Sequence, residues 1–170
     1  MTDTVMVRGF RHVLELYDKA TGELVDREDV FNLIPNVGID FLAQAPFGDA
    51  APIPQFYCGL FTANYIPTSS VTSAQIPTSM AEFVAYPNAT RPSWDRAYAN
   101  HTHDNAASKA IFLPSVDANV YGSFIVSSPT KGGNDGLLLS VARFSTVKAL
   151  SAGLEAKLWC GLTYVASNTI

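Results

Sequence analysis

The sequence of 170 residues predicts an all-β protein, a two-sheet sandwich of jelly-roll type with one short helix and long loops. Three observations lead to this fold class. Most of the patterned segments are short runs of bulky, β-favouring residues bounded by Gly, Pro, Asn or Asp. Only one segment has the apolar spacing that favours a helix. No helices alternate with the strands, as they would in a parallel α/β sheet.

The chain begins with a predicted hairpin. Residues 5–17 have the composition of a strand in which Gly9 is a candidate β-bulge, and residues 23–31 form the returning strand after a turn. Residues 26–29 make this the most densely charged part of the chain. We expect residues 1–31 to be an arm that packs less well than the sandwich of residues 32–170 and contacts neighbouring subunits. The alternative is that the hairpin contributes ordinary strands to a sheet of its own monomer.

The single predicted helix follows the arm. Residues 36–45 place Val37, Phe41 and Leu42 at helical spacing, with Asn36 as a candidate cap and a proline immediately after the segment. After the strand expected at residues 55–63, a long stretch rich in Ser, Thr and Pro predicts a loop with room for one short helical turn.

The second half of the chain supplies most of the predicted sandwich. We expect strands at residues 108–113, 119–127, 137–145 and 155–166. The clearest signal is the pair of runs on either side of residues 127–136, a loop with one proline and three glycines, which predicts a hairpin with a long tip. The polar residues 98–105 predict a loop.

Composition limits the possible functions. Hydrophobic residues make up 48% of the chain and charged residues 15%, against a usual charged share of about 25%. We expect other subunits to cover part of such a surface, in a homodimer or homotrimer. The alternative is a large core with small residues outside. The net charge of −4 argues against nucleic-acid binding, and no apolar run approaches the ~18 residues of a membrane helix. Residues 1–10 lack the pattern of a signal peptide, so we expect folding in a cytoplasm.

Candidate metal ligands occur together once. His101 and His103 would share one face of a strand, and Asp104 could assist. A tetrahedral site needs further ligands, and the remaining histidine, His12, lies far away in the sequence. We therefore expect a solvated turn and assign no metal. The glycine-rich residues 131–136 resemble a phosphate-binding nest, but a strand follows them where a helix would be needed, which favours a hairpin tip.

Other candidate sites are no more specific. Catalytic carboxylates would come from Glu82, Asp95, Asp104 or Asp117, but their spacing selects no pair, and Asp95 is a candidate partner for Arg91 or Arg96. Cys58 and Cys160 lie in apolar runs and are expected to be buried thiols. Their contexts, FYCGLF and LWCGLT, are similar by chance, or, as the alternative, mark two strands of one sheet with matched small positions. Six aromatic residues could form a sugar-binding platform: Tyr57, Tyr65, Tyr86, Trp94, Tyr98 and Tyr121. No catalytic, cofactor-binding or metal-binding residue is assigned.

Several motifs, in order, resemble those of a family of small virion structural proteins of tailed bacteriophages. The resemblance spans residues 30 to 165. Its motifs are NLIP at 32–35 followed by Gly38, YCGLFT at 57–62, EFVAY at 82–86, TRPxW at 90–94, VYGxFI at 120–125, SSPTKGG at 127–133 and ARF at 142–144. The N-terminal hairpin and the segment around His101 lie outside these motifs.

The resemblance implies a non-enzymatic particle protein. Within the family, it favours a capsid decoration (cement) protein that binds the major capsid protein on the outer surface of the head. The alternatives are a tail, collar or fibre-associated structural protein, or a carbohydrate-binding module for host attachment. The family has no catalytic motif, so the resemblance assigns no catalytic residue and no cofactor to this chain.

Overall fold

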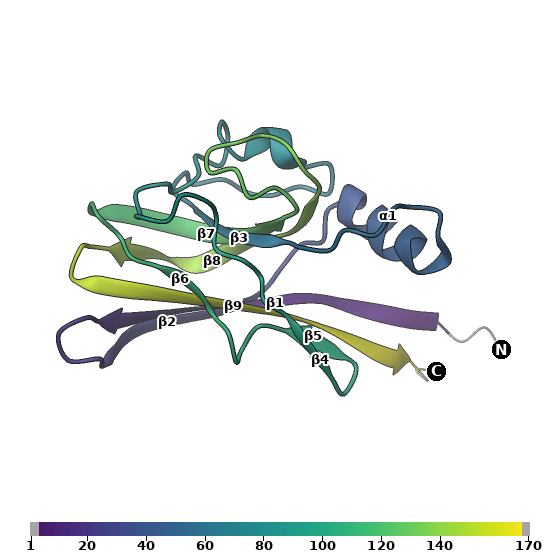
Figure 1. Cartoon of the computed structure of the whole chain (residues 1–170), viewed down its shortest axis with the longest axis horizontal. Coiled ribbons are helices and arrows are strands. Elements are labelled where there is room, and N and C mark those ends of the chain that lie inside the picture. Colours follow the sequence, from purple (N-terminus) through teal and green to yellow (C-terminus); the bar gives the residue numbers. More distant parts are fainter. Residues whose placement is uncertain (1–3, 168–170) are drawn as a thin grey trace.

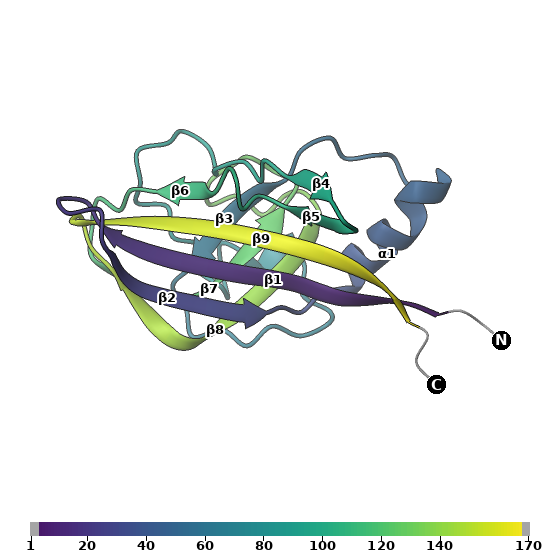
Figure 2. The same cartoon turned by 90° about the horizontal axis from the view of Figure 1, so that it is seen from below.

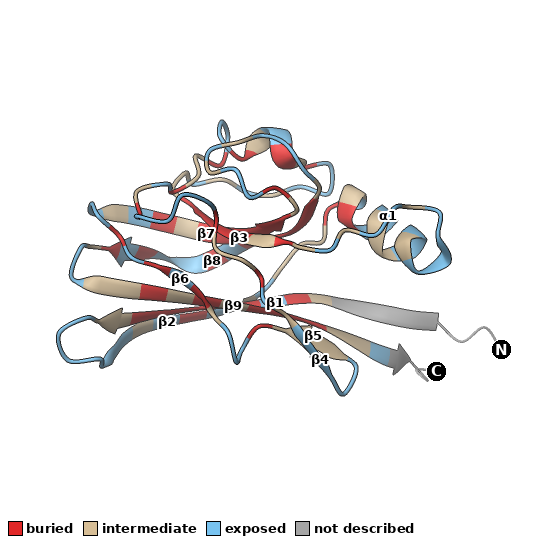
Figure 3. Cartoon of the chain, in the orientation of Figure 1, coloured by how far each residue is buried: buried red, intermediate tan, exposed pale blue. Residues whose placement is uncertain are grey.

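The computed structural model describes residues 4–167, with the side chains of residues 9–165, as two antiparallel sheets packed face to face (Figure 1). One short α-helix lies at one end of this sandwich. The larger cluster of buried residues lies where the two sheets face each other (Figure 3). A second cluster packs Val71, Ile76 and Met80 of the long loop against the smaller sheet. The prediction of an all-β fold with two sheets and one short helix is confirmed. Residues 1–3 of the predicted hairpin and 168–170 of the predicted sandwich lie outside the described residues.

The larger sheet has six strands. Its order is β2 (Leu24–Phe31), β1 (Thr4–Asp18), β9 (Leu154–Ser167), β5 (Thr102–Asp104) and β4 (Ala97–Ala99), with β6 (Ala110–Phe112) also paired to β9. β1 and β9 pair from Thr4 with Ser167 to Asp18 with Leu154 (Figure 2). The register shifts between Val7 and Phe10, and Gly9 there has a φ of +74°. The predicted bulge at Gly9 is therefore confirmed, in a backbone conformation that glycine adopts readily.

The smaller sheet has three strands in the order β3 (Tyr57–Phe61), β7 (Ala118–Val126) and β8 (Leu138–Leu150). Each overlaps a predicted strand, although β8 runs five residues beyond the predicted end at residue 145. Residues 127–137 connect β7 to β8 as the predicted long hairpin tip. The strands therefore form where bulky residues lie between turn residues, as the sequence pattern indicates.

The helix α1 (Asn36–Gln44) is followed directly by a 3-10 turn, η1 (Ala45–Phe47). The expectation that Asn36 caps the helix is wrong, because Pro35 occupies the cap position and Asn36 is the first helical residue. Pro35 is in an extended conformation, with φ of −67° and ψ of 161°, which the fixed φ of proline allows. A second 3-10 turn, η2 (Ser73–Gln75), begins with a capping box between Thr72 and Gln75 and confirms the short helical turn expected in the long loop.

The predicted loop at residues 98–105 is wrong in part, because β4 and β5 form a hairpin there. Its two-residue turn consists of Asn100 and His101, with φ of 49° and 64°. Two positive φ values are the signature of a turn that matches strand twist. The strands are short and polar, and β5 is held by pairing with β9, as in His103 with Leu162. That partner lies some 60 residues away, so no local pattern shows it.

The N-terminal hairpin belongs to the larger sheet. β1 lies between β2 and β9, and its side chains Phe10, Leu14 and Leu16 are buried in the core between the sheets. The expectation that the arm packs less well than the rest is wrong for β1, because β9 covers its edge and the smaller sheet covers its inner face. β2 forms an outer edge, where Leu24, Val25 and Phe31 are exposed.

A buried histidine joins the two sheets. His12 on β1 is fully buried, with its ring nitrogens 2.7 Å from the Ser123 hydroxyl on β7 and 2.6 Å from the Ser140 hydroxyl on β8. A neutral imidazole can donate from one nitrogen and accept at the other, and each serine hydroxyl can match it. Burial lowers the pKa of His12 to about 3, because the charged ring would lose its hydration.

An ion pair connects the same sheets at their β2–β8 side. The Lys148 ammonium lies 3.0 Å from the Glu28 carboxylate, and both side chains are nearly fully buried. Glu28 also accepts hydrogen bonds from the Ser145 amide and the Thr146 hydroxyl. Glu28, a charged residue of β2, therefore helps to hold the two sheets of the monomer together.

We expect the chain to lose stability between pH 7 and pH 5 because of His12. Its pKa is about 3 when folded, below its ordinary 6.5, so in this range the unfolded chain takes up a proton that the folded chain does not. The free energy of unfolding should fall by about 2 kcal/mol from this group over that interval. His103, whose pKa burial also lowers, contributes in the same direction.

Urea unfolding at pH 7, 6 and 5 measures this dependence. The His12→Asn variant should be less stable than the wild type but show a flatter dependence on pH. His101→Asn, at an exposed turn position, serves as the control and should keep the wild-type slope. Equal slopes in the wild type and His12→Asn would contradict the role assigned to His12.

Candidate functional site

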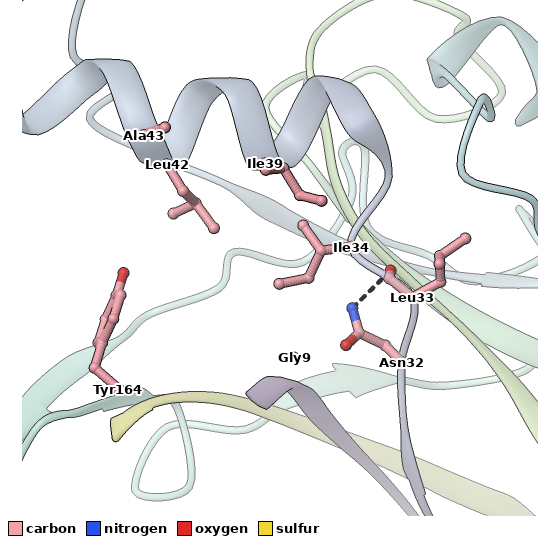
Figure 4. A pocket seen from close by; sticks show the side chains of 8 residues that line it. All are labelled: Gly9, Asn32, Leu33, Ile34, Ile39, Leu42, Ala43 and Tyr164. Atoms are coloured by element: carbon pink, nitrogen blue, oxygen red, sulfur yellow. Dashed lines mark hydrogen bonds between the residues drawn. The ribbon is translucent and has the colours of Figure 1, made fainter. Parts of the chain in front are cut away.

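An open groove lies between α1 and the β1–β9 pair, with a volume of about 530 Å³. α1 forms one wall, the segment that leads into it forms a second, and Tyr164 on β9 stands opposite (Figure 4). The lining is mostly apolar: Gly9, Asn32, Leu33, Ile34, Ile39, Leu42, Ala43 and Tyr164.

The floor of the groove is fixed by Asn32. Its side-chain oxygen accepts a hydrogen bond from the Phe10 amide next to the bulge, and its amide group donates to the Leu33 carbonyl at 2.8 Å. A Cβ atom on Gly9 would lie 2.8 Å from the Asn32 side-chain oxygen. Glycine at the bulge therefore lets the two segments approach, and the polar atoms of Asn32 are used within the chain.

The side of α1 that faces away from the groove packs against the rest of the fold. Gly38 packs so closely on β8 that a Cβ atom there would lie 2.6 Å from the Leu139 carbonyl oxygen. Phe41 packs edge-to-face on Phe56, with 5.8 Å between ring centroids. These contacts leave Ile39 at the groove with 52% of its surface exposed. The next turn exposes 83% of Phe47.

A smaller hollow of about 200 Å³ continues on the other side of Leu42 and Tyr164. His103 lines it between two tyrosines, with its ring centroid 4.8 Å from that of Tyr98 and 6.4 Å from that of Tyr164. Burial lowers the pKa of His103, and the charge of Arg96 adds to this shift. The imidazole is therefore neutral near pH 7.

The groove has the chemistry of a binding surface. Its walls are aliphatic, Asn32 is occupied by its own chain, and the Tyr164 hydroxyl is the remaining polar side-chain group among its lining residues. General acid–base or nucleophilic catalysis needs a titratable group or an activated nucleophile in contact with the reacting atoms. The arrangement instead suits apolar side chains of another molecule, which would shield Ile39 and Leu42 from water.

The candidate metal ligands do not come together. His101 is exposed at the tip of the β4–β5 turn, while His103 faces the two tyrosines. The Asp104 carboxylate accepts a hydrogen bond from the Ala106 amide at 2.9 Å. Among the residues described, no group of three or more His, Cys, Asp or Glu side chains is placed to hold a metal ion.

The candidate carboxylate Glu82 has a structural partner. Its side chain forms a two-pronged ion pair with Arg91, with oxygen–nitrogen distances of 2.8 and 2.7 Å, and both side chains are almost completely buried. The suggested pairing of Asp95 with Arg91 or Arg96 is wrong for Arg91, and the Arg96 guanidinium lies over the Trp94 ring instead.

The same ion pair holds the glycine-rich tip between β7 and β8. Arg91 donates to the Ser128 carbonyl at 2.9 Å and to the Gly133 carbonyl at 3.0 Å, while Glu82 accepts from the Gly132 amide at 2.7 Å. The amide that could have contributed to a phosphate-binding nest is therefore bound to a carboxylate of the chain itself. The expectation of a hairpin tip is confirmed.

The remaining candidates divide between the core and the surface: Tyr57, Tyr65 and Tyr121 are half-buried, and Asp117 is exposed. Cys58 and Cys160 are buried thiols as expected, but they lie in opposite sheets, so the alternative of two strands in one sheet is wrong. Tyr86 and Trp94 are buried, and the Trp94 indole donates to the Cys160 carbonyl at 3.0 Å. They are therefore unavailable to a sugar platform, whereas Tyr98 is 61% exposed.

Sequence reasoning did not find the groove. Its walls come from residues about 155 positions apart, and no spacing rule connects Gly9 to Tyr164. The available signals were the candidate bulge at Gly9 and the NLIP motif that leads into α1. Each marked a special backbone position without showing which surface it would shape.

No protein-family model matches the chain, and no curated protein matches it. Among the helices described, none combines the length and apolar character needed to cross a bilayer.

We expect Arg91→Met to destabilise the chain by roughly 3–5 kcal/mol, because it leaves the buried Glu82 carboxylate without its partner. Chemical denaturation measures the loss. Arg27→Met is the matched control: Arg27 pairs with Asp29 at 3.0 Å but 43% of its side chain is exposed, so the change should cost less than about 1 kcal/mol.

The double variant Glu82→Met/Arg91→Met provides a second comparison. It removes both charges and should be more stable than Arg91→Met alone, since no carboxylate then remains unpaired in the core. If Arg91→Met lowered the free energy of unfolding by as little as Arg27→Met does, the buried ion pair would not be what holds the hairpin tip.

Proposed function

We propose that this chain is a structural component of a bacteriophage particle, a capsid decoration (cement) protein that binds the major capsid protein and stabilises the shell. The order of motifs between residues 30 and 165 supports this function. Several of these motifs fall on contacts that shape the fold. NLIP leads into the groove wall, while EFVAY, TRPxW and SSPTKGG supply the Glu82–Arg91 cluster.

The observation that carries the proposal is the apolar end of the molecule. Ile39 lines an open groove and is 52% exposed, on a helix whose other face is anchored to the core, and Phe47 on the turn that follows this helix is 83% exposed. Exposed apolar side chains next to a preformed groove are typical of a protein interface. A neighbouring capsid subunit that inserts apolar side chains there would bury them.

The N-terminal hairpin offers a second contact. β2 forms an outer edge of the larger sheet and exposes Leu24, Val25 and Phe31. A strand edge can pair with another chain, and its side chains add apolar area. We assign this edge to contacts between subunits, either with the shell or within a homodimer or homotrimer. In this proposal the protein lies on the outer surface of the head.

We extend the fold class to the jelly-roll type within the same proposal. The chain moves repeatedly between the sheets: from β2 to β3, back to β4, across to β7, and back to β9. The first and last strands, β1 and β9, pair along their length. Long crossings between two sheets are a feature that jelly rolls share with other Greek-key sandwiches.

We expect the double variant Ile39→Asp/Phe47→Asp to bind purified shells at least tenfold more weakly than the wild type. Both side chains are exposed, so charges there should leave folding intact while removing apolar contacts worth more than about 1.4 kcal/mol at the interface. Co-sedimentation of the purified chain with shells that lack it measures the affinity, and circular dichroism checks the fold.

The control variant is Ile66→Asp/Val147→Asp, which changes two exposed apolar residues away from the groove lining and should bind as the wild type does. Cryo-electron microscopy of the particle locates the protein directly. Density on the tail, or specific sugar binding on a glycan array without shell binding, would overturn the decoration role in favour of a tail protein or a carbohydrate-binding module.

A further inference from the structure

Two thiols face each other between the sheets. Cys58 lies on β3 of the smaller sheet and Cys160 on β9 of the larger sheet, and both are fully buried in the same core cluster. Cys58 pairs with Ile125, which pairs with Ser140, so these three side chains lie on one face of the smaller sheet. Cys160 pairs with His12, whose ring lies 2.6 Å from the Ser140 hydroxyl, so both thiols lie on the facing sides of the two sheets at a similar level. Residues about 100 positions apart thus place two thiols in one cluster that is otherwise mostly aliphatic and aromatic.

The backbone holds both residues in place. The Cys58 amide donates to the Pro92 carbonyl at 2.8 Å, and Cys58 pairs with Ile125 of β7. The Cys160 amide donates to the Asn105 side chain at 2.7 Å, its carbonyl accepts from the Trp94 indole at 3.0 Å, and it pairs with His12 of β1. The backbone that carries each thiol is therefore fixed in its own sheet.

His12 is the neighbouring side chain that could act as a base for a cysteine. It is not available for this role, because its two ring nitrogens are hydrogen-bonded to Ser123 and Ser140. Burial and the adjacent Cys58 raise the pKa of the Cys160 thiol, so little thiolate forms in the closed fold. The folded, reduced chain should consequently react slowly, and oxidation should proceed mainly when the sheets separate or as the chain folds.

We propose that Cys58 and Cys160 are a disulfide site that links the two sheets covalently when the chain folds in the presence of a small-molecule disulfide. One protein thiolate attacks the oxidant, forms a mixed disulfide and releases one reduced thiol. The second protein thiolate then attacks the protein sulfur of that bond and releases the other half of the oxidant. Two protons pass from the protein thiols to the released thiolates, and two electrons pass to the oxidant.

The bond would stabilise the sandwich without depending on the proposed function. It would close a loop of about 100 residues, and a link across so long a loop removes more entropy from the unfolded chain than a link across a short one. It would also join β3 to β9, strands of different sheets for which no mutual hydrogen-bond pairing is found among the residues described. Burial would shield the bond from dissolved reductants until the fold opens.

The test is to refold the full reduced chain from urea with oxidised glutathione, and in parallel with reduced dithiothreitol. Oxidised material should be monomeric, about 2 Da lighter, and free of reactive thiols after denaturation. Peptide mapping should recover residues around 58 and 160 as one linked species. Its Tm should exceed that of the reduced chain by roughly 5–15 °C.

The variants Cys58→Ala and Cys160→Ala provide the controls. Each should lose the mass change and the difference in Tm between the two refolding conditions, whatever its own stability. Two free thiols in the refolded wild type, a stable glutathione adduct on either cysteine, or disulfide-linked dimers as the main product would overturn the proposal. These readouts concern the wild-type chain itself, so a poorly folding variant leaves the test intact.

Discussion

The pairing of the first and last strands is the constraint on which the rest of the structure depends. β1 and β9 run side by side for most of the length of the molecule (Figure 2). β2 attaches to the outer edge of β1, while β5 and β6 attach to β9. The inner side chains of this pair, including Phe10, Leu14 and Leu158, form one side of the main core. A chain that failed to bring its two ends together would lose the larger sheet and the floor of the groove at once.

Buried polar groups then fix how the two sheets sit on one another. His12 reaches from β1 to serines on β7 and β8, and Lys148 on β8 reaches Glu28 on β2. Hydrogen bonds of this kind tolerate little change in position, whereas aliphatic contacts tolerate sliding. A shift of one residue in β1 would turn His12 outward and leave the Ser123 hydroxyl buried without this partner. The polar contacts therefore help to select the register that hydrophobic packing alone would specify less sharply.

Polar side chains that are hydrogen-bonded within the chain support the fold, whereas the exposed apolar side chains beside them are available to bind another molecule. Arg91, Glu82 and Asn32 are fully used within the chain, where they fix the hairpin tip and the groove floor. What remains beside α1 is a groove with a mostly apolar lining, in which Ile39 is exposed, and an exposed Phe47 on the following turn. A rigid, apolar, preformed surface favours association with another protein, because little conformational entropy is lost when it binds.

The sequence by itself determined the local elements. Runs of bulky residues between turn residues specified most of the strands, helical spacing specified α1, and Gly9 specified the bulge, since each of these depends on neighbours within a few positions. Tertiary structure decided the partners. It packed β1 of the N-terminal hairpin against the core, paired Arg91 with Glu82, placed Cys58 and Cys160 in one core cluster from opposite sheets, and formed a hairpin of polar residues beside β9. Those outcomes depend on which distant segments donate or accept the hydrogen bonds and which ones bury the apolar side chains. Neither composition nor spacing along the chain shows which segments these are.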